Sequence, residues 1–414
     1  MTIVPPREGP VRLVLVGGGH AHLGVLEALA REKPEGLHVT LISAGERALY
    51  SGMVPGWLGG DYDFDQITFE LPALCRRAGV TFVPTPADRL LWPEEAPDPS
   101  GGLAPSLSDP LAGGGGTVLA GGEAHPFELA SLDIGSVPRG RELPGVREHA
   151  FALRPMERAR VLEEALVERV HEVGTRSAVR VVVVGGGAAG FEVALAVERR
   201  LEREGGLGDV TLLESGPRIL PGMSDRVGRR AEAILSRKGI EVRCDLPVHR
   251  VERDGVVVED DRILPSDLTI WATGAAPPPL LAASTLPLDE AGYFQVDASL
   301  RSVDGAPVWG AGDCIGLAGH PEMPKAGVYA VRQSPILARN LLAAATGAPS
   351  KDPHWYAPQR GFLALMNTAD GKALLRWKGI VVHTWWAWWL KDRIDRRFMA
   401  RYQALESSEP GGVV

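Results

Sequence analysis

Two stretches of the chain combine a run that is apolar except for one arginine with a glycine-rich end. Residues 11–16 precede "GGGHAH", and residues 179–184 precede "GGGAAG". An unbroken β-branched run is typical of a parallel strand that is buried on both faces. Each run is followed by a stretch with helical spacing and then by a second apolar strand, residues 39–43 and 210–214. The pattern therefore predicts a βαβ unit twice, with right-handed crossovers.

The similarity of the two halves continues downstream. "FELASLDIGSVP" aligns with "SDLTIWATGAAP", and each segment ends a predicted strand at a glycine that is followed by a proline. In both halves this strand comes after a predicted β-hairpin, around "GTVLAGGEAHPF" and "DGVVVEDDRIL". We therefore predict an α/β fold with two Rossmann-like units, each a βαβ unit plus a β meander.

The second glycine turn carries the complete dinucleotide pattern, in Gly185, Gly187 and Gly190. Glycines after a strand let a pyrophosphate approach the backbone N–H groups at a helix N-terminus. Glu214 ends the next strand, where a carboxylate accepts hydrogen bonds from a ribose diol and repels a 2′-phosphate. We interpret this half as a site for NAD(P)H with NADH favoured, although Arg218 four residues later counts against that preference.

The first glycine turn is incomplete, and we predict that it binds the other dinucleotide, FAD. Gly17 and Gly19 are present, but His22 replaces the third glycine, and Ser43 stands where the ribose-binding acid is expected. That third glycine normally serves close packing of helix and strand. Two interpretations stay open for His20 and His22: contact with the pyrophosphate or the flavin edge, or local packing and hydrogen bonding.

A third element favours FAD. "PVWGAGDC" is a short apolar strand that ends in Gly312 and Asp313, and a helix is predicted after "PKAG". A carboxylate at such a strand end suits ribityl hydroxyls, and a helix N-terminus that points at the flavin suits its negative charge. Gly135 and Gly274, which end the two aligned strands, complete the predicted cofactor-binding glycines.

Composition narrows the class of protein. The formal net charge of −8 argues against a nucleic-acid binder. The three cysteines form no Cys-x-x-Cys pair, no metal-ligand spacing is seen among the histidines, and no metal is expected. No apolar run reaches the length of a membrane span. We expect a cytoplasmic protein, and a peripheral position on the inner face of the cell membrane stays open.

The order of these motifs resembles the pyridine nucleotide-disulfide oxidoreductase superfamily, from about residue 11 to residue 345. Within it the chain looks like type II NADH dehydrogenases and sulfide:quinone oxidoreductases. "LYSGMVPGWLGGDY", "LDIGS" and "PKAGVYAVRQ" resemble more narrowly the branch associated with selenide, water dikinase. The resemblance implies FAD-binding parts at 1–150 and 277–348, with an NAD(P)H-binding domain at 151–276 inserted between them. Residues 349–414 would form a C-terminal interface or membrane-associated region.

The resemblance also implies roles for single residues. Gly17, Gly19, His20 and Ala21 would line the FAD pyrophosphate, Ser51 and Gly52 would lie near the flavin, and Gly312 and Asp313 would close on the ribityl chain. The two residues implied as catalytic are Lys325, near flavin N1/O2 at the start of a helix, and Glu192, near the nicotinamide and flavin N5. "SGMVPG" holds no redox cysteine, and we expect no lysine near "SGM" to pair with Glu192.

The C-terminal stretch "TWWAWWLKDRIDRRFMARYQ" predicts a helix with an apolar stripe and a basic remainder. The predicted stripe is Trp386, Leu390, Ile394, Phe398 and Tyr402, and the basic residues are Lys391, Arg393, Arg396, Arg397 and Arg401. Tryptophans beside basic residues suit an interfacial membrane helix, and such a membrane contact would run through residues 379–402. The walls of a quinone pocket, or docking on the protein body or on a second subunit in a homodimer, stay open.

These features predict an FAD-dependent NAD(P)H oxidoreductase. Hydride would pass from the nicotinamide to flavin N5 and electrons then to a small acceptor, with quinone as the first hypothesis. One alternative is a sulfur- or selenium-species reductase that uses Cys314 or attacks the flavin directly. A second alternative is a non-catalytic flavin or nicotinamide sensor.

Overall fold

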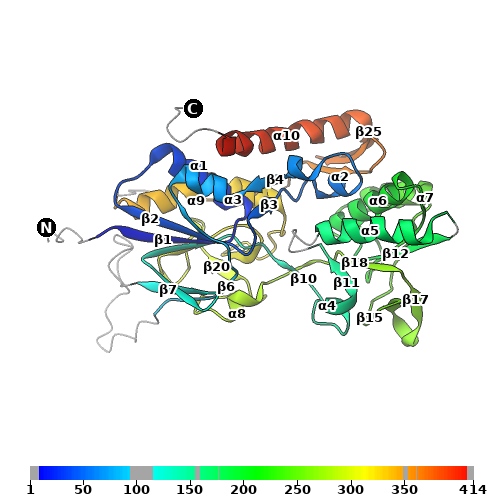
Figure 1. The fold of residues 1–414 in the computed structure, drawn as a ribbon, viewed down its shortest axis with the longest axis horizontal. Coiled ribbons are helices and arrows are strands. Elements are labelled where there is room, and N and C mark those ends of the chain that lie inside the picture. The colour runs from blue at the N-terminus through cyan, green and yellow to red at the C-terminus, as the bar shows by residue number, and fades with distance from the viewer. Residues whose placement is uncertain are drawn as a thin grey trace.

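The computed structural model describes residues 9–93, 115–153, 159–175, 177–347, 353–359 and 361–407. Figure 1 shows an α/β molecule in which helices cover one side of two β-sheets and a long C-terminal helix, α10, lies across the top. The helices are α1 His20–Glu32, α2 Val54–Leu58, α3 Leu71–Ala78, α4 Val146–His149, α5 Ala159–Val173, α6 Ala188–Arg203, α7 Asp225–Arg237, α8 Pro279–Ala282, α9 Gly327–Ala345 and α10 Trp385–Ser407.

The first half forms a five-stranded parallel sheet in the order β21-β9-β1-β2-β5. These strands are β1 Val11–Val16, β2 Leu37–Ile42, β5 Thr81–Val83, β9 Leu129–Leu132 and β21 Val308–Gly310. The central strand β1 is buried from Leu13 to Val16, as expected for a parallel strand that is covered on both faces.

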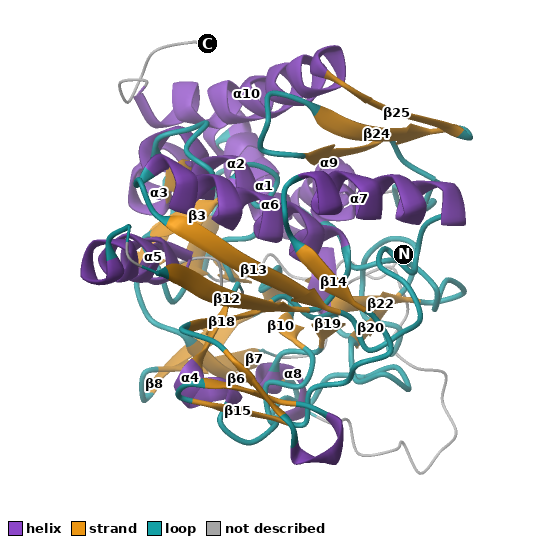
Figure 2. Cartoon of the chain, turned by 90° about the vertical axis from the view of Figure 1, so that its right-hand side faces the viewer, coloured by secondary structure: helices purple, strands orange, loops and turns teal. Residues whose placement is uncertain are grey.

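The second half repeats that order with a second parallel sheet, β11-β18-β12-β13-β14. These strands are β11 Ala150–Ala152, β12 Ala178–Val184, β13 Leu207–Leu213, β14 Glu241–Arg243 and β18 Leu268–Trp271. Figure 2 shows β12, β13 and β14 below helices α6 and α7. Strand β21, which follows the second sheet in the chain, returns to the first sheet, so the second unit is inserted in the first. The predicted fold class is confirmed, whereas the domain bounds stay predictions.

Antiparallel strands supply the rest of each half. Each half has a three-stranded meander, and one two-stranded ribbon joins the halves. These strands are β6 Ala87–Leu91, β7 Gly116–Ala120 and β8 Glu123–Phe127; β15 Arg250–Glu252, β16 Gly255–Val257 and β17 Ile263–Pro265; and β10 Val137–Pro138 with β19 Ala275–Ala276. Two further pairs are β3 Arg47–Leu49 with β4 Thr68–Glu70, and β20 Phe294–Val296 with β22 Ile315–Leu317.

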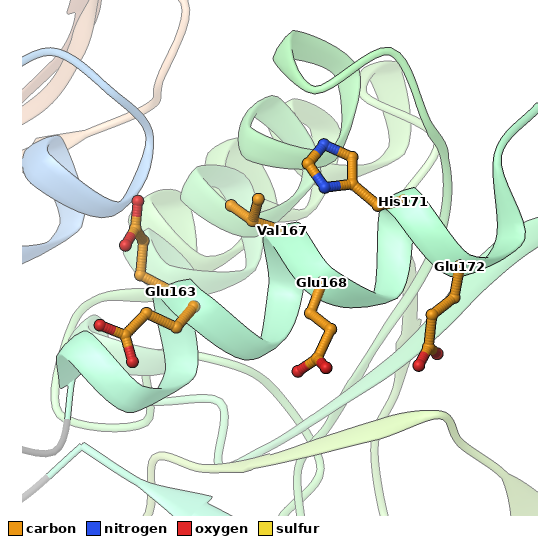
Figure 3. Close-up of a pocket in the computed structure, with 6 residues that line it drawn as sticks. Glu163, Val167, Glu168, His171 and Glu172 are labelled. Carbon is orange, nitrogen blue, oxygen red and sulfur yellow. The ribbon is translucent and has the colours of Figure 1, made fainter.

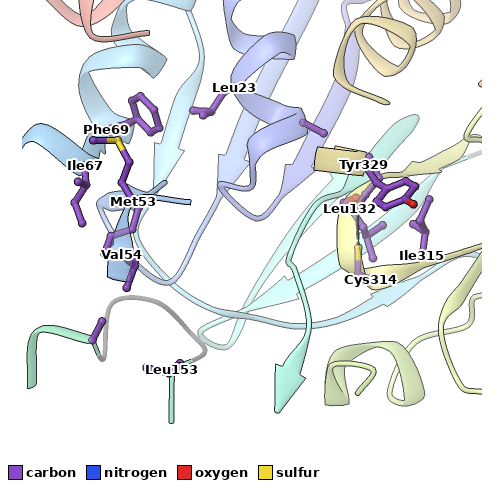
Figure 4. Close-up of a cluster of buried hydrophobic side chains, with 14 of the residues drawn as sticks. Leu23, Met53, Val54, Ile67, Phe69, Leu132, Leu153, Cys314, Ile315 and Tyr329 are labelled. Atoms are coloured by element: carbon purple, nitrogen blue, oxygen red, sulfur yellow. Dashed lines mark hydrogen bonds between the residues drawn. The ribbon is translucent and has the colours of Figure 1, made fainter. Parts of the chain in front are cut away.

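A large apolar core surrounds the first sheet and its glycine turn. In Figure 4, Met53 and Phe69 lie on one side of the turn, and Leu132, Cys314 and Tyr329 lie on the other. All five side chains are buried. The polar groups near the turn are therefore held in low-dielectric surroundings, where a hydrogen bond or an unpaired charge has a large effect.

The C-terminal region is a β meander followed by α10. Strands β23 Ala364–Asn367, β24 Ala373–Trp377 and β25 Ile380–Thr384 pair antiparallel, and α10 then packs on α3 and β4 of the first half. The expectation of an α+β tail is confirmed.

The predicted apolar stripe on α10 is wrong. Trp386 and Ile394 are 41% and 45% exposed, whereas Tyr402 is 3% exposed and Phe398 stacks on Tyr50 in the protein body. Positions four apart advance by about 40° around a helix, so a stripe of four such steps turns through about 160°. Its two ends therefore face opposite sides of the helix, one toward solvent and the other toward the protein.

Candidate functional site

The two glycine turns share one backbone construction. Gly17 and Gly185 both take a positive φ, 94° and 114°, directly after β1 and β12. A Cβ on Gly17 would lie 2.4 Å from the carbonyl oxygen of Asp133, and one on Gly185 would lie 2.6 Å from that of Ala272. Only glycine can both adopt this positive φ and leave room for the neighbouring carbonyl oxygen. The two aligned halves therefore make the same backbone contacts at their first glycine.

The third position of the pattern separates the two turns. A Cβ on Gly190 would lie 1.8 Å from the carbonyl oxygen of Gly185, so α6 packs directly on its strand. In the first turn the His22 ring fills this place, with Nδ1 2.6 Å from the carbonyl oxygen of Gly17 and Nε2 2.9 Å from Ser131 Oγ. Protein groups occupy both ring nitrogens of this buried side chain. These contacts support the interpretation that His22 serves local packing and hydrogen bonding.

His20 begins α1 and carries an unpaired polar atom. Its Nε2 is buried and finds no hydrogen-bond partner in the described part of the chain. The ring packs against Tyr50 and Phe398, with centroid distances of 5.5 and 6.0 Å. Burial lowers the pKa of His20 to about 4, so the ring is neutral at pH 7. A buried polar atom without a partner, beside a glycine turn, suits hydrogen bonding to a dinucleotide.

Asp133 places a carboxylate at the same helix N-terminus. Its Oδ2 accepts hydrogen bonds from the backbone N–H groups of Ala21 and His22, at 2.7 and 3.0 Å. Its backbone carbonyl accepts the N–H of Gly19. Burial raises the pKa of Asp133 to about 7, against the pull of the two N–H donors. Sequence analysis quoted "LDIGS" without giving this residue a role.

Gly312 and Asp313 lie at the carboxyl end of β21, beside the first glycine turn. They lie in a 3₁₀ turn, Gly312–Cys314, that follows β21. Gly312 has a φ of 76°, and its N–H donates to Gln333 Oε1 of α9 at 2.7 Å. Asp313 accepts a hydrogen bond from Ser136 Oγ at 3.2 Å. Both residues therefore stand beside the first glycine turn, where the sequence places them.

Lys325 lies near this turn but not at the start of a helix, because α9 begins at Gly327. Its ammonium donates to the carbonyl oxygen of Ile315 and stands 3.8 Å from the ring centroid of Tyr293. Burial lowers the pKa of Lys325. Nearby Cys314 is fully buried, and burial raises the pKa of its thiol to about 12, which does not suit a thiolate nucleophile.

The "SGM" loop meets the start of α9 and the side of α10. A Cβ on Gly327 would lie 3.2 Å from Ser51 Oγ, so this loop packs closely on the helix N-terminus. The carbonyl oxygen of Gly52 accepts a hydrogen bond from Lys391 Nζ at 2.6 Å. The expectation that no lysine lies near this loop is wrong, because Lys391 arrives from a helix more than 330 residues later in the chain.

Lys391 belongs to a group of polar side chains that we call the α10 cluster. It consists of the buried Lys391 and Asp395 and the partly buried Tyr50 and Glu192. Lys391 pairs with Asp395 at 2.8 Å, and Tyr50 Oη donates to Asp395 Oδ1 at 3.1 Å. Burial alone would lower the pKa of Lys391, but the charges of Asp395 and Glu192 hold it above its ordinary value. Sequence analysis assigned Lys391 to the basic exterior and missed this cluster.

Glu192 reaches the cluster from α6 of the second unit. Its Oε1 accepts the backbone N–H of Asn367 at 2.7 Å. Burial raises the pKa of Glu192 to about 7, and Lys391 acts in the opposite direction. A carboxyl that titrates near pH 7 can hold or release a proton under ordinary conditions. The cluster therefore joins the two dinucleotide-type units at one buried point.

The second glycine turn holds Glu214 where the sequence predicts it. The two carboxylate oxygens accept the N–H groups of Gly186 and Gly216, both at 2.8 Å. Arg218 instead turns away, donates to the carbonyl oxygens of Leu220 and Met223, and pairs with an acid of α7. The Glu214 carboxylate is thus held in place at the turn, and the Arg218 guanidinium binds other groups.

Other predicted residues lie at the open edges of the two turns. A Cβ on Gly187, Gly135 or Gly274 would meet no heavy atom within 4 Å in the described structure. Ser43 follows β2 directly, and its N–H donates to the carbonyl oxygen of Val83. Gly19 differs, because a Cβ there would lie 2.3 Å from the Asp133 carboxyl carbon.

A hollow of about 730 Å³ lies elsewhere, along helix α5. Figure 3 shows Glu163, Glu168, Glu172 and His171 projecting from one helix, without a residue of either glycine turn. No group of three or more His, Cys, Asp or Glu side chains suited to a metal ion occurs in the described residues. The chemistry therefore centres on the two turns and the α10 cluster.

Two parallel sheets, each ending in a glycine turn at a helix N-terminus, define the class of proteins with two dinucleotide-binding units. Residues 132–335 match the family model for pyridine nucleotide-disulphide oxidoreductases. The match covers just under half of the chain and shows a domain of the pyridine nucleotide-disulphide oxidoreductase type.

Curated relatives extend the match. Demethylphylloquinone reductase NdbB of Synechocystis is 28% identical over 261 residues, which are 61% of this chain and 62% of the relative. The alternative NAD(P)H-ubiquinone oxidoreductase C1 of Arabidopsis thaliana is 25% identical over 83% of this chain and 69% of its own length. The type II NADH:quinone oxidoreductase Ndh of Mycobacterium tuberculosis is 29% identical over 42% and 41%. The chain thus spans less than two thirds of the first and third of these relatives.

Solved structures agree on the fold. NDH2 of Plasmodium falciparum, in complex with NADH, superposes with a TM-score of 0.76 at 12% identity, over 98% of this chain and 99% of that one. Sulfide:quinone oxidoreductase of Aquifex aeolicus gives a TM-score of 0.72 at 17% identity, over 95% and 92%. The predicted likeness to type II NADH dehydrogenases is confirmed, and the likeness to the branch associated with selenide, water dikinase stays a prediction.

Proposed function

We propose that this chain is an FAD-dependent NAD(P)H oxidoreductase that passes electrons to a quinone. The observation that carries the proposal is the repeated turn. Gly17 and Gly185 make the same backbone contacts in two units of one chain, and the α10 cluster lies where the units meet. The relatives named for quinone reduction support the acceptor.

The residues present fit two dinucleotides. The glycine turn after β1 exposes backbone at a helix N-terminus. His20 Nε2 is a buried polar atom without a hydrogen-bond partner in the described residues. FAD would therefore lie along Gly17, Gly19, His20 and Ala21, and NADH along the turn of Gly185, Gly187 and Gly190. When bound, FAD would supply the redox chemistry, namely hydride acceptance from the nicotinamide and electron transfer to the quinone.

The protein's own side chains position the reacting groups and supply the one proton that the reaction takes up. NADH, one proton and a quinone give NAD⁺ and a quinol, so the reaction takes up a proton. Glu192 is suited to carry it, because its pKa is raised to about 7 by burial and Asn367 fixes its carboxylate. Lys391 holds the Gly52 carbonyl and pairs with Asp395, which fixes the loop that would face the flavin. We assign Lys325 to the stabilisation of negative charge beside the 3₁₀ turn.

An anaerobic titration tests the proposal. We expect purified protein with FAD to show a visible flavin band that bleaches on addition of NADH and returns on addition of a quinone. A band that does not bleach would contradict the hydride path and favour a sensor. If the band bleaches but does not return on addition of quinone, quinone is not the acceptor, and polysulfide and selenium compounds are tested next.

The preference for NADH is a separate prediction. Because Glu214 presents a fixed carboxylate and Arg218 is engaged with backbone carbonyls, the site favours a ribose diol over a 2′-phosphate. We expect Glu214→Gln to raise the KM for NADH about tenfold, the loss of roughly one charge-assisted hydrogen bond. Steady-state kinetics with both nucleotides measure it. Glu241→Gln, at an exposed position of β14, is the control and should leave the KM unchanged. An equal KM in all three proteins would contradict the ribose assignment.

We also propose that the start of α10 contacts a membrane surface peripherally. Trp385 and Trp389 are 69% and 52% exposed, and Ile380 on the preceding strand is 56% exposed. Exposed Arg393 and Arg397 lie on the same helix. Aromatic and basic groups together suit a lipid headgroup region. No helix in the described residues is long and apolar enough to span a bilayer.

Vesicle sedimentation tests the membrane contact. We expect the protein to pellet with phosphatidylglycerol-containing vesicles, and the double variant Trp385→Ser/Trp389→Ser to lose most of that binding. Trp355→Ser is the matched control, because Trp355 is 61% exposed but lies outside α10. Equal loss in the control variant, or no binding by the unmodified protein, would rule out this surface.

A further inference from the structure

The two halves of the molecule differ by one charged side chain beneath the glycine turn. Asp133 follows β9 in the first half, and Ala272 stands at the same place after β18 in the second. Their backbones are equivalent, since each carbonyl lies against the first glycine of its turn. Each N–H also donates to the last residue of the neighbouring strand, Val16 or Val184. The difference lies in the carboxylate.

That carboxylate occupies the centre of the first site. Oδ2 accepts the N–H groups of Ala21 and His22, two of the four donors that a helix N-terminus leaves unpaired. The other oxygen faces two glycines, because a Cβ on Gly19 or Gly312 would lie 2.4 or 2.6 Å from Oδ1. Asp133 is 3% exposed. It is thus enclosed between the first turn of α1 and the 3₁₀ turn, the two elements that would hold FAD.

The groups that face Asp133 do not neutralise its charge. From the 3₁₀ turn, Asp313 repels it, and the buried Cys314 thiol is neutral. From α1, the His22 ring is neutral and turned toward Gly17 and Ser131. From α9, Gln333 binds the Gly312 N–H and carries no charge. Burial and Asp313 therefore raise the pKa of Asp133 to about 7, and only the two backbone donors oppose them.

We propose that Asp133 is a resident anion that competes with the FAD diphosphate for the N-terminus of α1, so that FAD binding takes up a proton at Asp133. This inference rests on the proposed function. A diphosphate beside the carboxylate disfavours its ionised form, so the pKa of Asp133 rises when FAD binds. By linkage, FAD affinity falls as the pH rises above the pKa of the free protein, and protonation of Asp133 admits the second anion. The NADH site, with Ala272, lacks this dependence.

The test is the dissociation constant of FAD as a function of pH. Apoprotein is titrated with FAD from about pH 6 to about pH 9, with quenching of flavin fluorescence as the signal. With one linked proton, we expect the Kd to rise by up to about tenfold per pH unit above pH 7. Asp133→Asn should give a Kd independent of pH, because one amide oxygen can still accept both N–H groups that Oδ2 accepts now.

A control and a second measurement make the test decisive. Asp267→Asn removes a carboxylate that pairs with Arg169 and Arg180 away from this site, and it should keep the pH slope of the unmodified protein. Calorimetry in two buffers of different ionisation enthalpy counts the protons taken up by unmodified protein, even where Asp133→Asn does not fold. FAD binding with a flat Kd and no proton uptake overturns the inference alone. Absence of FAD binding at every pH overturns the proposed function as well.

Discussion

Replacement of Lys391 by methionine is expected to lower the free energy of unfolding by about 3–5 kcal/mol, the cost of leaving a buried partner charge uncompensated. The Lys391 and Asp395 side chains are 10% and 6% exposed and pair at 2.8 Å. Methionine keeps much of the apolar length of lysine but removes its charge and its bond to the Gly52 carbonyl. Denaturant unfolding at pH 7 measures the change.

The pH dependence of this variant has a definite sign. Without Lys391, burial raises the folded-state pKa of Asp395 and Glu192 further above the unfolded values. Such acids bind protons more tightly when folded, so their contribution is retained at low pH and lost as the pH rises. We therefore expect the deficit of Lys391→Met to shrink as the pH falls from 7 toward 5. A deficit that grows toward acid pH would contradict this explanation.

Two further variants isolate the pair. Arg396→Met removes an ion pair with Asp392 on the same helix, but Arg396 is 48% exposed, so we expect a loss below about 1 kcal/mol. The double variant Lys391→Met/Asp395→Asn removes both buried charges and should recover part of the stability lost by Lys391→Met alone. Equal losses for Lys391→Met and Arg396→Met would show that burial of the Lys391 pair has no special effect.

The parts of the fold that could be predicted depend on local patterns. The apolar runs before Gly17 and Gly185 are strands because both faces are covered, and the glycines follow because the chain must turn with a positive φ against a neighbouring carbonyl. The repeat of these signals was enough to predict two parallel sheets. Glu214 could be assigned for the same reason, since its place at a strand end determines which turn its carboxylate reaches.

The rest of the site depends on contacts between distant segments. Lys391 and Glu192 come from helices about 200 residues apart, and the residues beside each in the sequence do not show that the two side chains meet. A spacing of four residues predicts a single face only over a short helix, because each step turns by about 40° and the stripe on α10 spans four steps. Asp133 carried a detectable signal: alignment of the halves sets it opposite Ala272, and an acid opposite an alanine next to a glycine turn marks a difference in charge.

Gly190→Ala is expected to disrupt the second unit while leaving the first intact. A Cβ at this position would lie 1.8 Å from the carbonyl oxygen of Gly185, a backbone atom that cannot move without displacing the turn. Overpacking of this kind costs about 1–3 kcal/mol or more. We expect a loss of that size in the free energy of unfolding and a large loss of NADH affinity, with the visible FAD spectrum unchanged.

Gly187→Ala is the matched variant, two residues earlier in the same turn. Its φ of −71° suits any residue, and a Cβ there meets no heavy atom within 4 Å in the described structure. Alanine should therefore leave the free energy of unfolding within about 0.5 kcal/mol of the unmodified protein. It should still weaken NADH binding, because the added methyl group stands in the open space where a pyrophosphate would approach the helix N-terminus. Loss of NADH affinity in Gly190→Ala but not in Gly187→Ala would mean that the nucleotide does not approach this turn, and that the glycine pattern serves only the packing of α6 on β12.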